Sequence, residues 1–249
     1  MIRITSIGEP ISSLSYMNAK SGGGTEISRL DISLASVGPL ADELDAIICC
    51  SDLQGMLQGE LLGVAVADHL AQLVEERVLP PAMRTGVILA GDLYSVPAAN
   101  QRGGYGDVAI VWDAFAQHFA WIAGVAGNHD DMTNVGGDRI HVLDGEIVEL
   151  DGFRIGGVGG IIGNARKPGR RDERDHLAQI ASVVEDGCDI LVLHEGPNGD
   201  DAQTGNPTIR ELVTTPFTVC GHRHWATPLA EHEHGQILNV DARVVVLVR

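Results

Sequence analysis

The chain has 249 residues, and its 17 lysines and arginines against 34 aspartates and glutamates give a formal net charge of −17. Four cysteines are too few for a disulfide scaffold, while 44% hydrophobic and 20% charged residues are typical of a globular protein rather than a disordered one. So large an excess of negative charge disfavours nucleic acids and anionic membrane surfaces as partners.

The first 45 residues contain two strand-like stretches, residues 2–7 and 26–37, with a Ser/Gly-rich connection over residues 21–25 between them. We interpret residues 1–45 as an N-terminal extension that adds strands to the main domain.

From residue 46 onward, short apolar runs alternate with helical patterns. The runs suit strands buried on both faces, and they are residues 46–50, 87–90, 120–126, 190–193 and 217–220. Apolar residues at helical spacing predict helices over residues 60–77, 107–118 and 172–185.

Two further segments have the pattern of antiparallel strands. Residues 139–158 alternate and carry turn signals at Asp144-Gly145 and Asp151-Gly152, and residues 236–248 have the pattern of another hairpin. The order of strands and helices predicts a layered α/β fold, and we expect one domain over residues 1–249 because no repeat or linker divides the chain. No apolar run is long enough to span a membrane and no signal-peptide core is evident, so we expect a cytoplasmic protein.

Each of the five apolar runs ends in polar residues. In chain order these are Asp52 and Gln54, Asp92, Gly127-Asn128-His129-Asp130, His194, and Gly221-His222-Arg223-His224. Because ligands of α/β sheets bind at the carboxyl ends of the strands, we expect these side chains to converge. The alternative reading, ordinary polar residues at strand ends, would have to hold at all five ends at once.

The residue types indicate a metal site. Carboxylate, amide oxygen and imidazole together favour Mn, Fe or Zn over Ca, and these strand ends offer no thiolate ligand. They contain more ligands than one ion needs, whereas two ions about 3.5–4 Å apart that share one carboxylate would use them all.

These motifs, in this order, resemble those of the calcineurin-like metallophosphoesterases, D-x-H, G-D, G-N-H-[DE], H and G-H-x-H. The resemblance runs from about residue 46 to residue 249. It implies a two-sheet β-sandwich flanked by helices, and a binuclear metal-dependent phosphohydrolase in which a metal-bridging hydroxide attacks phosphorus.

The resemblance also implies a role for each residue. The first ion would be held by Asp52, Gln54, Asp92 and His224. Asp92 would bridge to the second ion, which would be completed by Asn128, His194 and His222. His129 would protonate the leaving oxygen, with Asp130 able to orient it.

Gln54 stands where the family has a histidine. A neutral amide is a weaker ligand than imidazole, so we expect the first site to bind metal less tightly or to prefer a harder ion such as Mn or Mg. Manganese is therefore the expected metal, with iron, zinc and magnesium as alternatives.

The expected substrate is a small phosphodiester or phosphomonoester. Leu-Tyr-Ser follows Gly91-Asp92, in place of the V-D-R-G of the protein Ser/Thr phosphatases. The loops 94–105 and 160–174 are expected to set specificity, and the candidate phosphate contacts are Arg102, Arg166, Lys167 and Arg170.

A second hypothesis is a non-catalytic protein with the same fold, acting as a binding or scaffold module with a weakened first metal site. Gln54 and the N-terminal extension, which could also form a homo-oligomer contact, favour it. The retained His129 and the remaining metal ligands oppose it.

Overall fold

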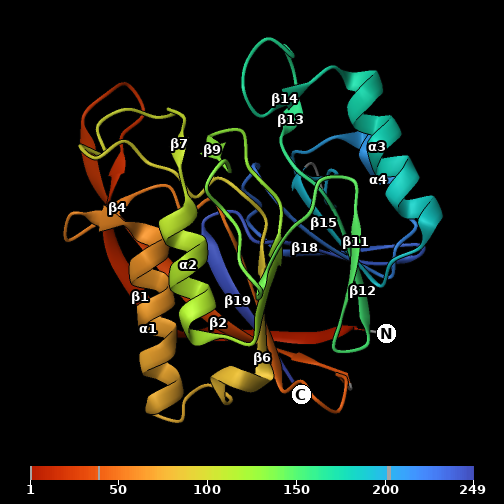
Figure 1. Cartoon of the computed structure of the whole chain (residues 1–249), viewed down its shortest axis with the longest axis horizontal. Coiled ribbons are helices and arrows are strands. Elements are labelled where there is room, and N and C mark those ends of the chain that lie inside the picture. The colour runs from red at the N-terminus through yellow and green to blue at the C-terminus, as the bar shows by residue number, and fades with distance from the viewer. Residues whose placement is uncertain (1, 39, 201–202) are drawn as a thin grey trace.

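The computed structural model describes residues 2–38, 40–200 and 203–249. Two β-sheets face each other, and helices cover the outer face of each sheet (Figure 1). The expected two-sheet sandwich flanked by helices is confirmed.

The larger sheet has nine strands within the described residues. In spatial order they are β10 (Ile140–Val142), β8 (Trp121–Gly124), β6 (Thr85–Leu89), β3 (Ala46–Ser51), β19 (Arg243–Val248), β2 (Thr25–Val37), β1 (Ile4–Ala19), β4 (Met56–Leu57) and β5 (Glu60–Leu61). Strands β3, β6, β8 and β10 are parallel, so their carboxyl ends lie at one edge.

The smaller sheet has six strands in the same part of the chain. In spatial order they are β11 (Ile147–Leu150), β12 (Phe153–Val158), β15 (Ile190–Glu195), β16 (Phe217–Gly221), β18 (Gly235–Asn239) and β17 (Leu229–His232). Strands β12, β15, β16 and β18 are parallel. Two short pairs lie outside the sheets, β7 (Gly106–Asp107) with β9 (Asp130–Asp131) and β13 (Ile161–Ile162) with β14 (Arg170–Arg171).

Helices α1 (Leu62–Glu75) and α2 (Ala109–His118) pack on the larger sheet, and α3 (Glu173–Asp186) and α4 (Pro207–Leu212) pack on the smaller one. A 3₁₀ helix, η1 (Ala82–Arg84), precedes β6. The predicted helices are confirmed within a few residues at each end, whereas α4 was not predicted because it spans less than two turns. None of the helices in the described residues is long and apolar enough to cross a membrane.

The core explains why the strand-forming runs are apolar throughout. In β3, Ile47 and Cys49 face the smaller sheet, whereas Ile48 and Cys50 face α1 and α2, and all four are fully buried. A strand covered on both sides has no polar face, so its sequence does not alternate.

The N-terminal hairpin is part of the larger sheet. Strand β1 pairs with β2 almost along its whole length, and β2 pairs in parallel with β19. The sequence pattern predicted only residues 2–7 of β1, because Gly8 and Pro10 are typical strand breakers. Register shifts around Pro10 accommodate them within one long bulged strand.

Two of the predicted hairpins are wrong. Residues 236–248 form β18 and β19, which lie in different sheets, and Asp144-Gly145 joins β10 of the larger sheet to β11 of the smaller one. Asp151-Gly152 does connect a hairpin, β11 with β12, and both residues have the positive φ angles, 45° and 77°, that such a turn requires. Alternating polarity shows which face of a strand is buried, but it does not identify the neighbouring strand.

Candidate metal centre

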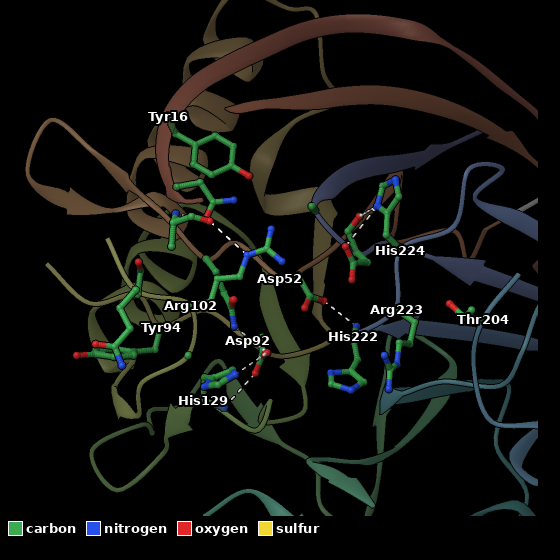
Figure 2. Close-up of a pocket in the computed structure, with 18 residues that line it drawn as sticks. Tyr16, Asp52, Asp92, Tyr94, Arg102, His129, Thr204, His222, Arg223 and His224 are labelled. Atoms are coloured by element: carbon green, nitrogen blue, oxygen red, sulfur yellow. Dashed lines mark hydrogen bonds and ion pairs between the residues drawn. The ribbon is translucent and has the colours of Figure 1, made fainter. Parts of the chain in front are cut away.

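The carboxyl ends of strands from both sheets meet at one edge of the sandwich. Asp52 and Asp92 follow β3 and β6 of the larger sheet, and Asn128 lies in the loop after β8. His194 lies in β15 and His222 follows β16 of the smaller sheet. Figure 2 shows Asp52, Asp92 and His222 directed toward one cavity, with His129 beside Asp92.

Three of these residues have an uncommon backbone conformation. Asp52, Asp92 and His222 have φ angles of 53°, 55° and 65°, in the left-handed region that side chains disfavour. Such conformations persist only where the surrounding structure enforces them, and they cluster at functional sites. Close packing contributes here, because a Cβ added at Gly127 would collide with Asp92 and one added at Gly221 would collide with Asp52.

Asp92, His194 and His222 form a compact group whose donor atoms all lie within 4.8 Å of one another. The Nδ1–H of His194 donates to the carbonyl of Ala90 at 2.8 Å, which leaves Nε2 facing Asp92 Oδ1 at 3.4 Å. This tautomer presents a nitrogen lone pair to the group, as a metal ligand must.

Two buried atoms of the centre have no hydrogen-bond partner among the described residues, His194 Nε2 and Asn128 Oδ1. Leaving a buried polar atom unpaired costs about 1–3 kcal/mol, so such atoms call for a ligand. A carboxylate, an amide oxygen and two imidazoles suit a divalent ion such as Mn, Fe or Zn. The side chains of Asp92, Asn128, His194 and His222 therefore fit a metal ion.

The electrostatics of the group point the same way. Burial by itself would lower the pKa of His194, but the Asp92 carboxylate raises that pKa to about 10. Burial, followed by the charge on His194, lowers the pKa of His222 to about 3. Asp92 thus requires one positive partner in this space, either a proton on His194 or a metal ion.

The residues expected around the first ion are arranged differently. Gln54 Nε2 donates to Asp92 Oδ2 at 2.8 Å, and since a carboxylate only accepts hydrogen bonds, the amide nitrogen must face it. Asp52 Oδ2 accepts from the Ser51 hydroxyl and from the backbone N–H of His222.

His224 does not join the compact group. Its Nδ1 lies 3.4 Å from Asp241 Oδ1, its Nε2 lies 3.1 Å from Arg243 Nη2, and 60% of its side chain is exposed. Asp241 lies just before β19 and Arg243 is its first residue. The sequence pattern had paired this strand with β18, whereas it lies in the other sheet.

His129 has the position expected of a proton donor. Its Nδ1–H donates to the carbonyl of Gly104 at 2.5 Å, and its Nε2 faces the centre, 3.9 Å from Asp92 Oδ2. The carbonyl of Gly104 therefore orients the ring.

The expected role of Asp130 needs correction. Among the described residues its carboxylate makes no hydrogen bond to the His129 ring, and instead it accepts four backbone N–H bonds, from Asp92, Leu93, Tyr94 and Gly127 at 2.7–3.1 Å. Because its side chain is buried and all its contacts are to the backbone, Asp130 holds the loops after β6 and β8 together.

A cavity of about 560 Å³ lies in front of the centre. The N-terminal hairpin forms one wall with Tyr16 and Asn18, and Arg102 projects from the loop 94–105 (Figure 2). Arg102 Nε donates to the carbonyl of Ala19 at 3.3 Å, which joins this loop to the hairpin.

The other expected phosphate contacts lie elsewhere. Arg166, Lys167 and Arg170 do not line this cavity, and Arg170 lines a separate one of about 400 Å³ together with Gly127, Asp130 and Arg171. Pairing of β13 with β14 and the bonds from Arg171 to Gly159 and Asp144 hold this basic segment there.

Several cavity residues were missed by the sequence analysis. Tyr16 and Asn18 belong to a strand whose length was underestimated, and Asp241 lies where the chain crosses between the sheets. Arg223 also lines the cavity, and its place between His222 and His224 was an available signal.

No family model and no curated protein matches the sequence. Among solved structures, the protein TT1561 of Thermus thermophilus is similar at 11% identity, over 80% of this chain and 90% of that one, with a TM-score of 0.55. Vps29 of Chaetomium thermophilum matches at 14% identity, over 78% of this chain and 70% of that one, with a TM-score of 0.35. AQ665 of Aquifex aeolicus, a protein of unknown function, matches at 14% identity, over 81% of this chain and 95% of that one, with a TM-score of 0.36. The likeness to TT1561 shows a shared fold.

Proposed function

We propose that this protein is a metal-dependent phosphoesterase that hydrolyses a small phosphodiester or phosphomonoester. The observation that carries the proposal is the compact group of Asp92, His194 and His222, with His129 Nε2 3.9 Å from Asp92 Oδ2. His194 Nε2 and Asn128 Oδ1, from the same strand ends, are buried without a partner among the described residues. The order of the motifs that supply these residues matches the metallophosphoesterases, which supports the same reaction.

The cavity favours a small anionic substrate. Its volume of about 560 Å³ is within the range of small-molecule sites, and its basic side chains are Arg102 and Arg223. Arginine binds phosphate through paired N–H groups, so these side chains are suited to the non-bridging oxygens of a phosphoester. The net charge of −17 opposes nucleic acids as substrates. For the location of the protein in the cell, we propose the cytoplasm.

A divalent ion, with manganese as the proposed metal, would neutralise charge that develops on the phosphoryl oxygens and would acidify water in the site. Asp92, Asn128, His194 and His222 would hold it. The remaining steps depend on the protein. Arg102 orients the substrate, and the imidazolium form of His129, held through Nδ1–H by the Gly104 carbonyl, gives its Nε2 proton to the leaving oxygen and becomes the neutral imidazole.

One observation favours the alternative of a non-catalytic scaffold, namely that Gln54 and His224 do not join the compact group. A scaffold, however, has no need for a histidine oriented by a backbone carbonyl at the edge of a cavity that contains arginine. We therefore retain the enzyme as the proposed function.

The proposal is tested by chelation and reloading. Purified protein is stripped of metal with a chelator, and hydrolysis of bis-p-nitrophenyl phosphate and p-nitrophenyl phosphate is followed before and after addition of Mn²⁺. We expect no turnover in the stripped protein and turnover of at least one compound after reloading. Metal-loaded protein that hydrolyses neither compound would favour the scaffold.

A further inference from the structure

Three of the four residues expected to hold the first ion, Asp52, Gln54 and His224, make hydrogen bonds to the protein in place of metal contacts. Gln54 turns its amide nitrogen, which cannot bind a metal cation, toward Asp92. Both ring nitrogens of His224 contact Asp241 or Arg243, and Asp52 Oδ2 accepts two hydrogen bonds. In this arrangement the amide nitrogen of Gln54 and the ring of His224 do not fit a metal ion, and Asp52 Oδ2 is bound to the protein.

The residues expected around the second ion, in contrast, include buried atoms without a hydrogen-bond partner. Asn128 Oδ1 and His194 Nε2 are buried and have no partner among the described residues, and the donor atoms of Asp92, His194 and His222 already lie within 4.8 Å of one another. Asn128 Oδ1 and His194 Nε2 can therefore bind an ion without first giving up a hydrogen bond to the protein.

The two oxygens of Asp92 have different partners. Oδ1 faces His194 Nε2 at 3.4 Å and accepts from the backbone N–H of His129 at 3.0 Å, whereas Oδ2 accepts from the Gln54 side chain at 2.8 Å. The amide N–H of Gln54 therefore binds the oxygen of Asp92 that does not face His194.

We propose that the centre binds one divalent ion, between Asp92, Asn128, His194 and His222, and that Gln54 replaces the other ion by holding Asp92 in position. Gln54 is then a positioning residue that acts on the metal through Asp92. The inference rests on the proposed function for the identity of the centre, but it concerns the number of ions, which can be measured without a substrate.

The test is the manganese content of the full chain. Protein is equilibrated with Mn²⁺, freed of unbound metal by gel filtration and analysed by elemental analysis and by electron paramagnetic resonance. We expect one Mn²⁺ per chain with the six-line spectrum of an isolated ion. Two ions per chain, or the spectrum of two coupled ions, would overturn the proposal.

A variant at Gln54 tests its role. Gln54→Ala removes the hydrogen bond to Asp92, so we expect one ion bound about 10–100-fold more weakly, the usual effect of losing a residue that orients a ligand. Unchanged Mn²⁺ affinity in Gln54→Ala would contradict the positioning role. His234→Ala, at an exposed histidine, is the matched control, with unchanged content and affinity.

The outcomes separate this inference from the proposed function. Two ions together with phosphoester hydrolysis would reject the one-ion centre and keep the enzyme. One ion without hydrolysis would keep the one-ion centre and reject the enzyme. Protein that binds no Mn²⁺ would overturn both.

Discussion

At the scale of single residues, the hydrogen bonds separate two neighbours that the motif groups together. His129 has one ring nitrogen bound to Gly104 and the other facing the centre, whereas the carboxylate of Asp130 is fully occupied by backbone N–H groups. His129 is therefore available for proton transfer, and Asp130 maintains the loops that carry Asp92 and His129.

Replacing His129 by Ala tests the first of these roles. We expect turnover of a phosphodiester with a poor leaving group to fall about 10²–10⁴-fold, the usual contribution of a general acid, while Mn²⁺ content is unchanged. With a p-nitrophenolate leaving group, which leaves without protonation, the loss should be much smaller. His234→Ala serves as the control. Equal losses with both leaving groups would argue against proton donation by His129.

His176 gives a prediction about stability. It is fully buried in α3 and neither ring nitrogen has a partner among the described residues. Burial, followed by the charges of Arg171 and His194, lowers the pKa of His176 from 6.5 to about 4. Because the folded state resists protonation, its stability is complete above pH 6.5 and falls as the pH drops toward 4, by about 3 kcal/mol from this group.

The measurement is the free energy of unfolding of wild type and His176→Leu at several pH values. Leucine fills the site without a group to protonate, so we expect the variant to lose about 3 kcal/mol less than wild type between about pH 6.5 and pH 4. Parallel pH profiles for the two proteins would show that His176 does not titrate between these values.

At the scale of elements, the N-terminal hairpin contributes one wall of the cavity. Strands β1 and β2 extend the larger sheet, and Tyr16, Asn18 and Ala19 near the end of β1 line the cavity. The bond from Arg102 to Ala19 joins the hairpin to the loop after β6, so two segments far apart in sequence shape one wall.

Arg102→Ala tests this wall. The guanidinium of Arg102 lines the cavity, and a charge-assisted hydrogen bond contributes about 1.5–3 kcal/mol, so we expect KM for a phosphoester to rise about 10–100-fold with Mn²⁺ content unchanged. Arg166→Ala removes an exposed arginine that does not line the cavity and should leave KM as it is. If Arg166→Ala raised KM more than Arg102→Ala does, the substrate would bind at the basic segment 164–174 and not at Arg102.

The elements that the sequence predicted well are those whose pattern depends on local burial. Runs such as β3 and β15 are apolar on both faces because a second sheet and helices cover them, and α1 shows its buried stripe directly. The pairing of distant strands leaves no such local pattern. This is why β18 and β19 were assigned to one hairpin, and why Asp241 and Arg243 were not expected beside His224.

The candidate centre also has a part that the sequence predicted and a part that it did not. The strand-end motifs identified Asp92, Asn128, His194 and His222, because carboxyl ends of parallel strands converge. The orientation of Gln54, the contacts of His224 and the backbone bonds of Asp130 depend on rotamers and on neighbours from other strands. Spacing along the chain does not encode them.

At the scale of the whole molecule, two sheets meet at one edge and a cavity with two arginines lies in front of that meeting point, in a chain of net charge −17. The acidic surface opposes extended polyanions, whereas the local arginines and a bound cation would attract one small phosphoester. The fold positions the side chains, and the metal that we propose would complete the site.

The most direct test of the proposed centre is hydrolysis of bis-p-nitrophenyl phosphate with added Mn²⁺ by wild type and Asp92→Asn, with Asp138→Asn as an exposed control of equal charge change. Asp92 is the carboxylate of the compact group, so we expect turnover by wild type and Asp138→Asn and none by Asp92→Asn, which should also lose its metal. Equal turnover by Asp92→Asn, or turnover that persists after the metal is removed, would contradict a metal-dependent phosphoesterase.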